Sequence, residues 1–145
     1  MLTLTAHKKR GFTLIELLVV VAIIGVLAAV VLIAINPARR LRQARDSGRK
    51  SDVSQLATAL QAYYTTNSNY PAGLTALTVT QDLKSLPLQP NGTAYSYSLN
   101  STTTEASVWA SLEAPTTDTT NTYNWCWQTS SGRARELSTG VACAP

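Results

Sequence analysis

The residue that most needs a chemical explanation in this sequence is Glu16. It lies one turn inside an apolar stretch, because Leu17 to Ile35 contains no charged or polar side chain. Nineteen residues at ~1.5 Å rise make a helix of roughly 28 Å, close to the thickness of the hydrocarbon core of a bilayer. An unpaired charge in such a segment is costly. Glu16 therefore requires a partner.

Proteolysis would supply that partner. The apolar run contains no Lys or Arg, and the basic residues before Gly11 keep their charges better in water. A cut after Gly11 would make Phe12 the new N-terminus, and its α-amino group would be a cation at the depth of Glu16. The sequence thus predicts a processed chain in which Phe12 and Glu16 carry opposite charges.

The segment Lys8-Lys9-Arg10-Gly11-Phe12-Thr13-Leu14-Ile15-Glu16 resembles the prepilin leader-peptidase site of type IV pilins and type II secretion pseudopilins. The motif-level resemblance covers about residues 8 to 36. It implies cleavage between Gly11 and Phe12 on the cytoplasmic side and N-methylation of Phe12. It also implies a helical filament of many copies with Glu16 as an assembly contact. The implied partners are prepilin peptidase/methylase and an inner-membrane assembly platform.

Two simpler roles for the apolar run fit the residues less well. A secretory signal peptide would have a shorter core, no Glu16, and a small-residue cleavage site at its end. An ordinary single-pass anchor would account for the hydrophobicity, but it gives no reason for a carboxylate there or for Gly11 before Phe12.

The distribution of charge separates the chain into two parts. Up to Lys50 there are nine Lys or Arg and two carboxylates, whereas from Ser51 onward there are three and six. By the positive-inside rule, the side of a membrane helix with more Lys and Arg faces the cytoplasm, so a plain count of the flanking cations would put the C-terminal part there. The only cysteines, Cys126 and Cys143, favour an oxidising compartment for that part, as does the cleavage-site resemblance. We therefore expect a cytoplasmic N-terminus.

Four segments are expected along the chain. Residues 1–11 form the leader, 12–36 the transmembrane and filament-core helix, 37–66 its amphipathic continuation, and 67–145 a small β domain.

The dipeptide Asn36-Pro37 interrupts the helical pattern and leaves two outcomes open, a second helix capped by Asn36 or one kinked helix. Residues 39–50 are too charged for a core, and two roles stay open for them. They face either the membrane surface or a neighbouring subunit, or they form a solvated basic face.

Three alternating segments predict strands in the distal domain. The residues that share one face of each are Tyr95, Tyr97 and Leu99; Ala106, Val108, Ala110 and Leu112; and Tyr123, Trp125 and Trp127. Polar linkers join them, which suits an antiparallel meander of three strands. The expected fold class is α+β, with a long N-terminal helix packed against a small antiparallel sheet, as in pilins.

The two cysteines are predicted to form a disulfide. Cys126 and Cys143 enclose sixteen residues, and closing a loop of that size contributes ~3 kcal/mol in the chain-entropy model. A metal site would need further ligands at suitable spacing. In the family that the motif resembles, such a pair encloses a surface loop, which here would be Gln128 to Ala142.

The sequence contains no recognisable set of catalytic residues. It has no phosphate loop and no nucleophile with a histidine to activate it, so no catalytic residue, cofactor or metal is expected. Glu105, Glu113 and Asp118 with Asn121 match no calcium loop, and we interpret them as solvated carboxylates. Arg133 and Arg135 are too few to follow a phosphate backbone, so nucleic acid is not an expected partner.

These observations favour a structural filament subunit, anchored as a precursor in the cytoplasmic membrane and mature in an extracellular or periplasmic filament. The alternatives are a type II secretion pseudopilin and a monomeric membrane-tethered binding domain.

Overall fold

The computed structural model describes residues 11–116 and 122–145. The chain separates into two compact units, Met1–Pro37 and Ala38–Pro145. The leader residues before Gly11, and Asp118 and Asn121 of the considered calcium ligands, lie outside the described residues.

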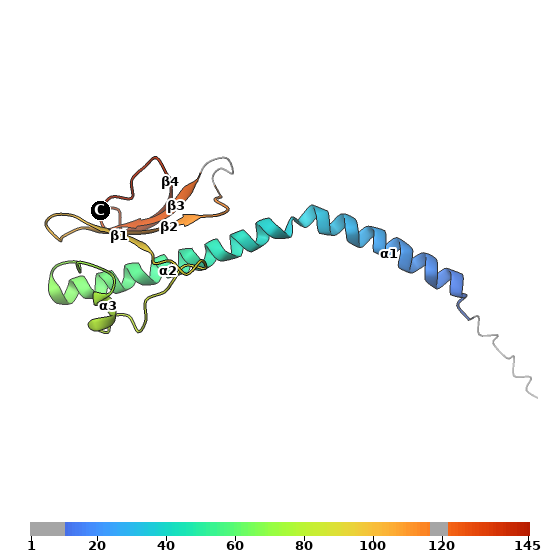
Figure 1. The fold of residues 1–145 in the computed structure, drawn as a ribbon, viewed down its shortest axis with the longest axis horizontal. Coiled ribbons are helices and arrows are strands. Elements are labelled where there is room, and N and C mark those ends of the chain that lie inside the picture. Colours follow the sequence, from blue (N-terminus) through green and yellow to red (C-terminus); the bar gives the residue numbers. More distant parts are fainter. Residues whose placement is uncertain (1–10, 117–121) are drawn as a thin grey trace, which may run out of the picture. The chain divides into compact units, whose positions relative to one another are not determined.

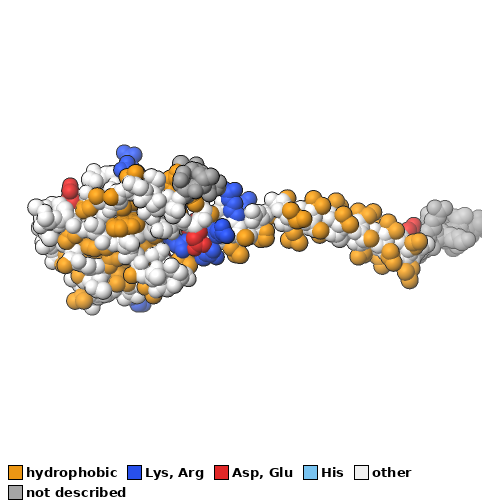
Figure 2. All heavy atoms as spheres, turned by 45° about the horizontal axis from the view of Figure 1, so that its top comes forward, with side chains coloured by type: hydrophobic (Ala, Val, Ile, Leu, Met, Phe, Trp, Pro, Cys, Tyr) orange, Lys and Arg blue, Asp and Glu red, His pale blue; other side chains and the backbone are white. Residues whose placement is uncertain are grey.

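The described part of the first unit, from residue 11 onward, holds the helix α1 (Leu14–Ile35). Its mean hydropathy of 3.4 over a membrane-length window makes it long and apolar enough to cross a bilayer. None of its residues is buried in the structure, and the face visible in Figure 2 is almost entirely hydrophobic.

The junction after α1 settles one alternative left open by the sequence. Asn36 adopts a left-handed conformation, with φ 47° and ψ 74°, and a new helix, α2 (Pro37–Asn67), begins at the proline. Proline disfavours the α region for the residue before it, and asparagine tolerates left-handed geometry better than most residues. The outcome is a break between two helices, with Asn36 as the C-cap of α1.

In its described residues, the second unit is built on α2 and a sheet of four antiparallel strands in the order β1-β2-β3-β4. The strands are β1 (Ser96–Leu99), β2 (Ala106–Leu112), β3 (Tyr123–Gln128) and β4 (Arg133–Ser138). In Figure 1, α2 runs between this sheet and the segment that carries the short helix α3 (Ala76–Val79). The predicted α+β class is confirmed, whereas the prediction of three strands misses β4.

The core lies where α2 meets the sheet. Val53, Leu56 and Leu60 are fully buried on α2, at spacings that place them on one helix face. From β2, alternate residues including Ala106, Val108 and Ala110 are buried with them in the same cluster. The alternation predicted for this strand therefore identifies the face that packs on the helix.

Candidate functional site

The predicted processing junction lies just before α1. Phe12 is 87% exposed, and Thr13 is the N-cap of the helix, with an extended φ of −84° and ψ of 151°. A Cβ added at Gly11 would meet no atom of residues 11–116 or 122–145 within 4 Å. Gly11 and Phe12 are thus accessible and outside the helix.

Glu16 takes part in a capping box with Thr13. The Glu16 carboxylate accepts hydrogen bonds from the backbone N–H of Thr13 at 2.9 Å and from its hydroxyl at 2.7 Å. In return, the backbone N–H of Glu16 donates to Thr13 Oγ1 at 3.3 Å. These bonds satisfy amide groups that the first turn of a helix otherwise leaves without partners.

Thr13 was not predicted as a partner of Glu16. The signature was present, because Thr followed three residues later by Glu at the start of an apolar run is the sequence pattern of a capping box. The pair between Phe12 and Glu16 stays a prediction, since it needs the amine that only cleavage releases.

A second group of polar side chains joins α2 to the sheet around Asp46. Asp46 is only 3% exposed. Its carboxylate accepts hydrogen bonds from the backbone N–H groups of Glu113, at 3.0 Å, and Ala114, at 2.7 Å. Arg49, also buried, donates to it at 2.7 Å. Asp46 is thus a buried charge with an ion-pair partner and two backbone donors.

Glu113 completes this cluster, which consists of Arg45, Asp46, Arg49 and Glu113. Its carboxylate accepts hydrogen bonds from the guanidinium of Arg45 and, at 2.6 Å, from that of Arg49. The hydrogen bonds from Arg45 and Arg49 lower the pKa of Glu113 from 4.5 to about 2. The positive charges of two arginines and the negative charges of two carboxylates therefore cancel at the end of β2.

Lys50 makes a third link between α2 and the sheet. Its ammonium lies 2.9 Å from the carboxylate of Glu136 in β4 and 4.4 Å from the centre of the Trp125 ring in β3. Trp125 and Glu136 are register partners, so one lysine contacts neighbouring strands.

These contacts correct the expectation for residues 39–50. The charged half of the helix was expected to face the membrane, another subunit or solvent, yet Asp46 and Arg49 are buried against the sheet of their own chain. The charges are tolerated there because each has partners of opposite sign or backbone donors. Nothing in the local sequence indicated this burial, since the partners at the end of β2, Glu113 and Ala114, lie more than 60 residues away.

The carboxylates considered for calcium do not come together in the described ranges. Glu113 is held by arginines, and Glu105 is exposed. Among residues 11–116 and 122–145, no group of three or more His, Cys, Asp or Glu side chains is placed to hold a metal ion.

The structure places a disulfide between Cys126 in β3 and Cys143, with their Cα atoms 5.9 Å apart. The segment between them was expected to be a surface loop, but it contains β4 and so is largely a hairpin. Ser107 Oγ donates to the Cys143 carbonyl at 2.7 Å, and Gln128 Nε2 donates to the Ala144 carbonyl at 2.5 Å. The C-terminal tail is therefore fixed onto the sheet.

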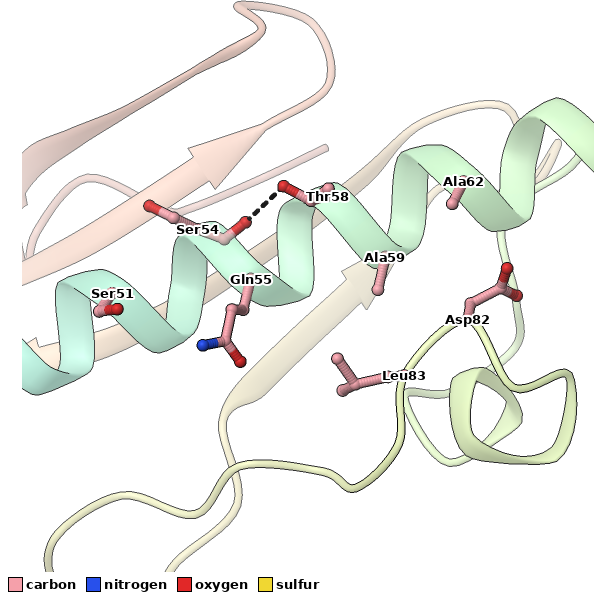
Figure 3. Close-up of a pocket in the computed structure, with 8 residues that line it drawn as sticks. All are labelled: Ser51, Ser54, Gln55, Thr58, Ala59, Ala62, Asp82 and Leu83. Carbon is pink, nitrogen blue, oxygen red and sulfur yellow. Dashed lines mark hydrogen bonds between the residues drawn. The ribbon is translucent and has the colours of Figure 1, made fainter.

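An open groove of about 540 Å³ runs along α2 (Figure 3). Its lining comes mostly from small and polar side chains of the helix, together with Asp82 and Leu83 from the segment after α3. Thr58 Oγ1 donates to the Ser54 carbonyl within the helix at 3.0 Å. The lining contains no histidine or cysteine, and it offers no pairing of nucleophile and base.

Comparison with known proteins identifies both a family motif and individual relatives. The family profile described as "Prokaryotic N-terminal methylation motif" matches residues 6–32. The type II secretion system core protein G of Pseudomonas aeruginosa is 37% identical over 107 residues, which is 63% of this chain and 74% of that protein. The type IV wide pilus major component PilA4 of Thermus thermophilus is 36% identical over 95 residues, 66% of this chain and 70% of that protein.

A further relative matches over a smaller share of its length. Core protein G of Escherichia coli is 40% identical over 83 residues, 57% of this chain and 52% of that protein. The chain thus spans about half the length of that relative. No solved structure matches the chain.

Proposed function

Since the chain belongs to the family of type IV pilins and type II secretion pseudopilins, we propose that it is a filament subunit made as a precursor. In this proposal a prepilin peptidase/methylase cuts between Gly11 and Phe12 and methylates the new amine. An assembly platform in the inner membrane then adds the mature chain to a helical filament of identical copies through residues 12–36.

The observation that carries this proposal is the combination at the start of α1. Gly11 and Phe12 lie outside the helix, and a carboxylate stands at the entrance of a helix that is otherwise apolar enough to cross a membrane. In a simple anchor the capping box with Thr13 would be the whole use of Glu16, whereas a filament subunit can also use its charge to fix the height at which a neighbour docks. A subunit at the wrong height would leave the Phe12 amine and Glu16 unpaired in a medium of low dielectric.

The proposed topology places the N-terminus in the cytoplasm and the unit from Ala38 onward outside. The disulfide between Cys126 and Cys143 supports this orientation, because structural disulfides persist in oxidising compartments. The four-segment division at residues 11, 36 and 66 is part of the same proposal. Its last boundary lies one residue before the end of α2.

The experiment is intact-mass analysis of the chain recovered from membranes and from sheared filaments. The wild-type mass should correspond to a chain that begins at a methylated Phe12. A Gly11→Val variant should remain full length in the membrane and yield no filament. Since no residue in the described ranges lies within 4 Å of a Cβ at Gly11, this substitution should leave the described fold intact and test the peptidase alone. Normal processing of Gly11→Val would contradict the proposal.

The second candidate is a pseudopilin of a type II secretion system, which the matches to core protein G favour. Deletion of the gene separates the two functions. Loss of surface filaments indicates a pilin, and accumulation of secreted proteins inside the cell envelope indicates a pseudopilin. A cleaved chain that remains a monomer in the membrane would instead support a tethered binding domain.

A further inference from the structure

Two Asn-X-Thr triplets occur in the second unit, Asn91-Gly92-Thr93 and Asn100-Ser101-Thr102. This triplet is the acceptor pattern for attachment of a sugar chain to the asparagine amide in surface loops of secreted proteins. So short a pattern also occurs by chance. The structure distinguishes the two triplets by the surroundings and the hydrogen bonds of each asparagine.

Asn91 lies in a closed turn between α3 and β1. The backbone N–H of Gly92 donates to the Gln89 carbonyl at 2.8 Å, which makes a β-turn with Pro90 and Asn91 in its central positions. The backbone N–H of Gln89 donates to the Thr93 carbonyl at 2.9 Å. Asn91, Gly92 and Thr93 are all exposed. The turn therefore presents the first triplet to solvent in a defined conformation.

The side-chain amide of Asn91 is held by its oxygen. Thr93 donates to Asn91 Oδ1 from its backbone N–H at 3.2 Å and from its hydroxyl at 2.8 Å. Because a backbone N–H can only donate, the atom that faces it must be the amide oxygen. Within the part of the chain that the structure describes, no group accepts a hydrogen bond from Asn91 Nδ2. The nitrogen that would carry a sugar is thus accessible.

Asn100 is bound within its own turn. It is half-buried after the end of β1. Its Oδ1 accepts hydrogen bonds from the backbone N–H groups of Thr104, at 3.0 Å, and Glu105, at 3.1 Å. Its Nδ2 donates to the Thr104 hydroxyl at 3.1 Å, and the Thr102 hydroxyl pairs with that same hydroxyl at 2.8 Å. A sugar on Asn100 would disrupt the turn between β1 and β2.

We propose that Asn91 is the acceptor of an N-linked glycan, transferred by a membrane-bound oligosaccharide transferase from a lipid pyrophosphate donor. Asn91 Nδ2 forms a bond to the anomeric carbon of the first sugar, and the bond between that carbon and the pyrophosphate oxygen breaks. The lipid pyrophosphate leaves, and a base of the transferase takes the proton that Nδ2 loses. The proposal rests on the proposed topology, which places the second unit outside the cytoplasm.

The test is intact-mass analysis of the full chain recovered from membranes of the cells that make it, with fragmentation of the peptide that contains Asn91. Asn91→Gln removes the acceptor. Thr93→Ala removes the hydroxyl that the triplet requires, and Thr93→Ser restores it. Thr102→Ala is the matched control, because it makes the same change in the second triplet at an equally exposed position and leaves Asn100 with its bonds to Thr104 and Glu105.

The wild-type chain should carry the mass of a sugar chain on Asn91. Asn91→Gln and Thr93→Ala should lose this mass, whereas Thr93→Ser and Thr102→Ala should keep it. The proposal would be overturned by an unmodified wild-type chain, by a sugar that persists in Asn91→Gln, or by a mass change that comes only from hydrolysis of the Asn91 amide to a carboxylate.

The same spectra report the N-terminus of the chain, and this result is independent of the mass on Asn91. A chain that begins at a methylated Phe12 and carries no sugar would overturn the glycan alone and leave the proposed function standing. A chain that keeps its leader would contradict the proposed processing, and fragmentation would still show whether Asn91 is modified.

Discussion

The carboxylate of Asp46 accepts a hydrogen bond from the backbone N–H of Ala114 at 2.7 Å, although 68 residues separate the two in sequence. It thereby connects α2 to the end of β2. Replacing Asp46 with Ala should destabilise the distal unit by about 3 kcal/mol, because the substitution leaves two partly buried amides without an acceptor and removes the ion-pair partner that Asp46 gives to buried Arg49.

The measurement is chemical denaturation of the full-length chain in detergent, followed by tryptophan fluorescence. Ser47→Ala is the matched control, since the exposed Ser47 hydroxyl donates to the Gln43 carbonyl in the same helix, and it should change the stability by less than about 0.5 kcal/mol. Equal stability of the Asp46→Ala variant and the wild type would contradict the role given to Asp46.

Acid should weaken the same connection through Glu113. The folded-state pKa of Glu113 is about 2, below its ordinary value of 4.5, so its contribution is present above pH ~4.5 and is lost as the pH falls toward about 2. Because a third of the side chain is exposed, we expect about 1 kcal/mol after solvent screening. Denaturation at pH 7 and pH 3 should show this loss in the wild type. The Glu113→Gln variant should show a smaller pH dependence, and an identical one would refute the assignment.

The disulfide should stabilise the distal unit by roughly 2 to 5 kcal/mol, the range for removing one from a small secreted domain. A Cys126→Ser/Cys143→Ser variant should unfold at a correspondingly lower denaturant concentration. The double substitution is preferred because it leaves no unpaired thiol. Thiol titration of the native chain gives an independent check, and two reactive thiols would contradict both the bond and the oxidising compartment.

Glu16 has two roles that substitution can separate. Glutamine can replace glutamate in a capping box, so Glu16→Gln should keep the start of α1 while removing the charge. We expect this variant to insert into the membrane at least as well as the wild type and to yield much less sheared filament. Thr13→Ala is the control, since it removes the side-chain cap and keeps the charge.

The two yields are compared by immunoblot of membrane and filament fractions. Thr13→Ala should lose less filament than Glu16→Gln. If the two variants lose the same amount, the cap and not the charge governs assembly. A Glu16→Gln variant that assembles as well as the wild type would refute the proposed contact with Phe12.

The parts of this fold that could be predicted from the sequence are those set by local patterns. The apolar run defines α1, and alternation along Ala106 to Leu112 identifies the buried face of β2. Both depend only on the periods of helices and strands. The strand β4 was missed because Arg133, Arg135 and Glu136 interrupt any apolar alternation. An edge strand in contact with solvent tolerates such residues.

The ionic cluster could not be predicted for a different reason. Burial of Asp46 and Arg49 depends on the position of Glu113, and no local pattern encodes a contact across more than 60 residues. The capping box is the opposite case, since Thr13 and Glu16 are three residues apart and their spacing was sufficient to predict it.

The disulfide makes a closed covalent ring out of β4 and the turn before it. Ser130, Ser131 and Gly132 in that turn are exposed, as are Arg133 and Arg135 beyond it, so a protease that reaches this unit would find accessible peptide bonds there. A single cut within the ring would leave both fragments joined through Cys126 and Cys143. A nicked subunit would therefore keep its C-terminal residues, and the damage would appear on a gel only after reduction.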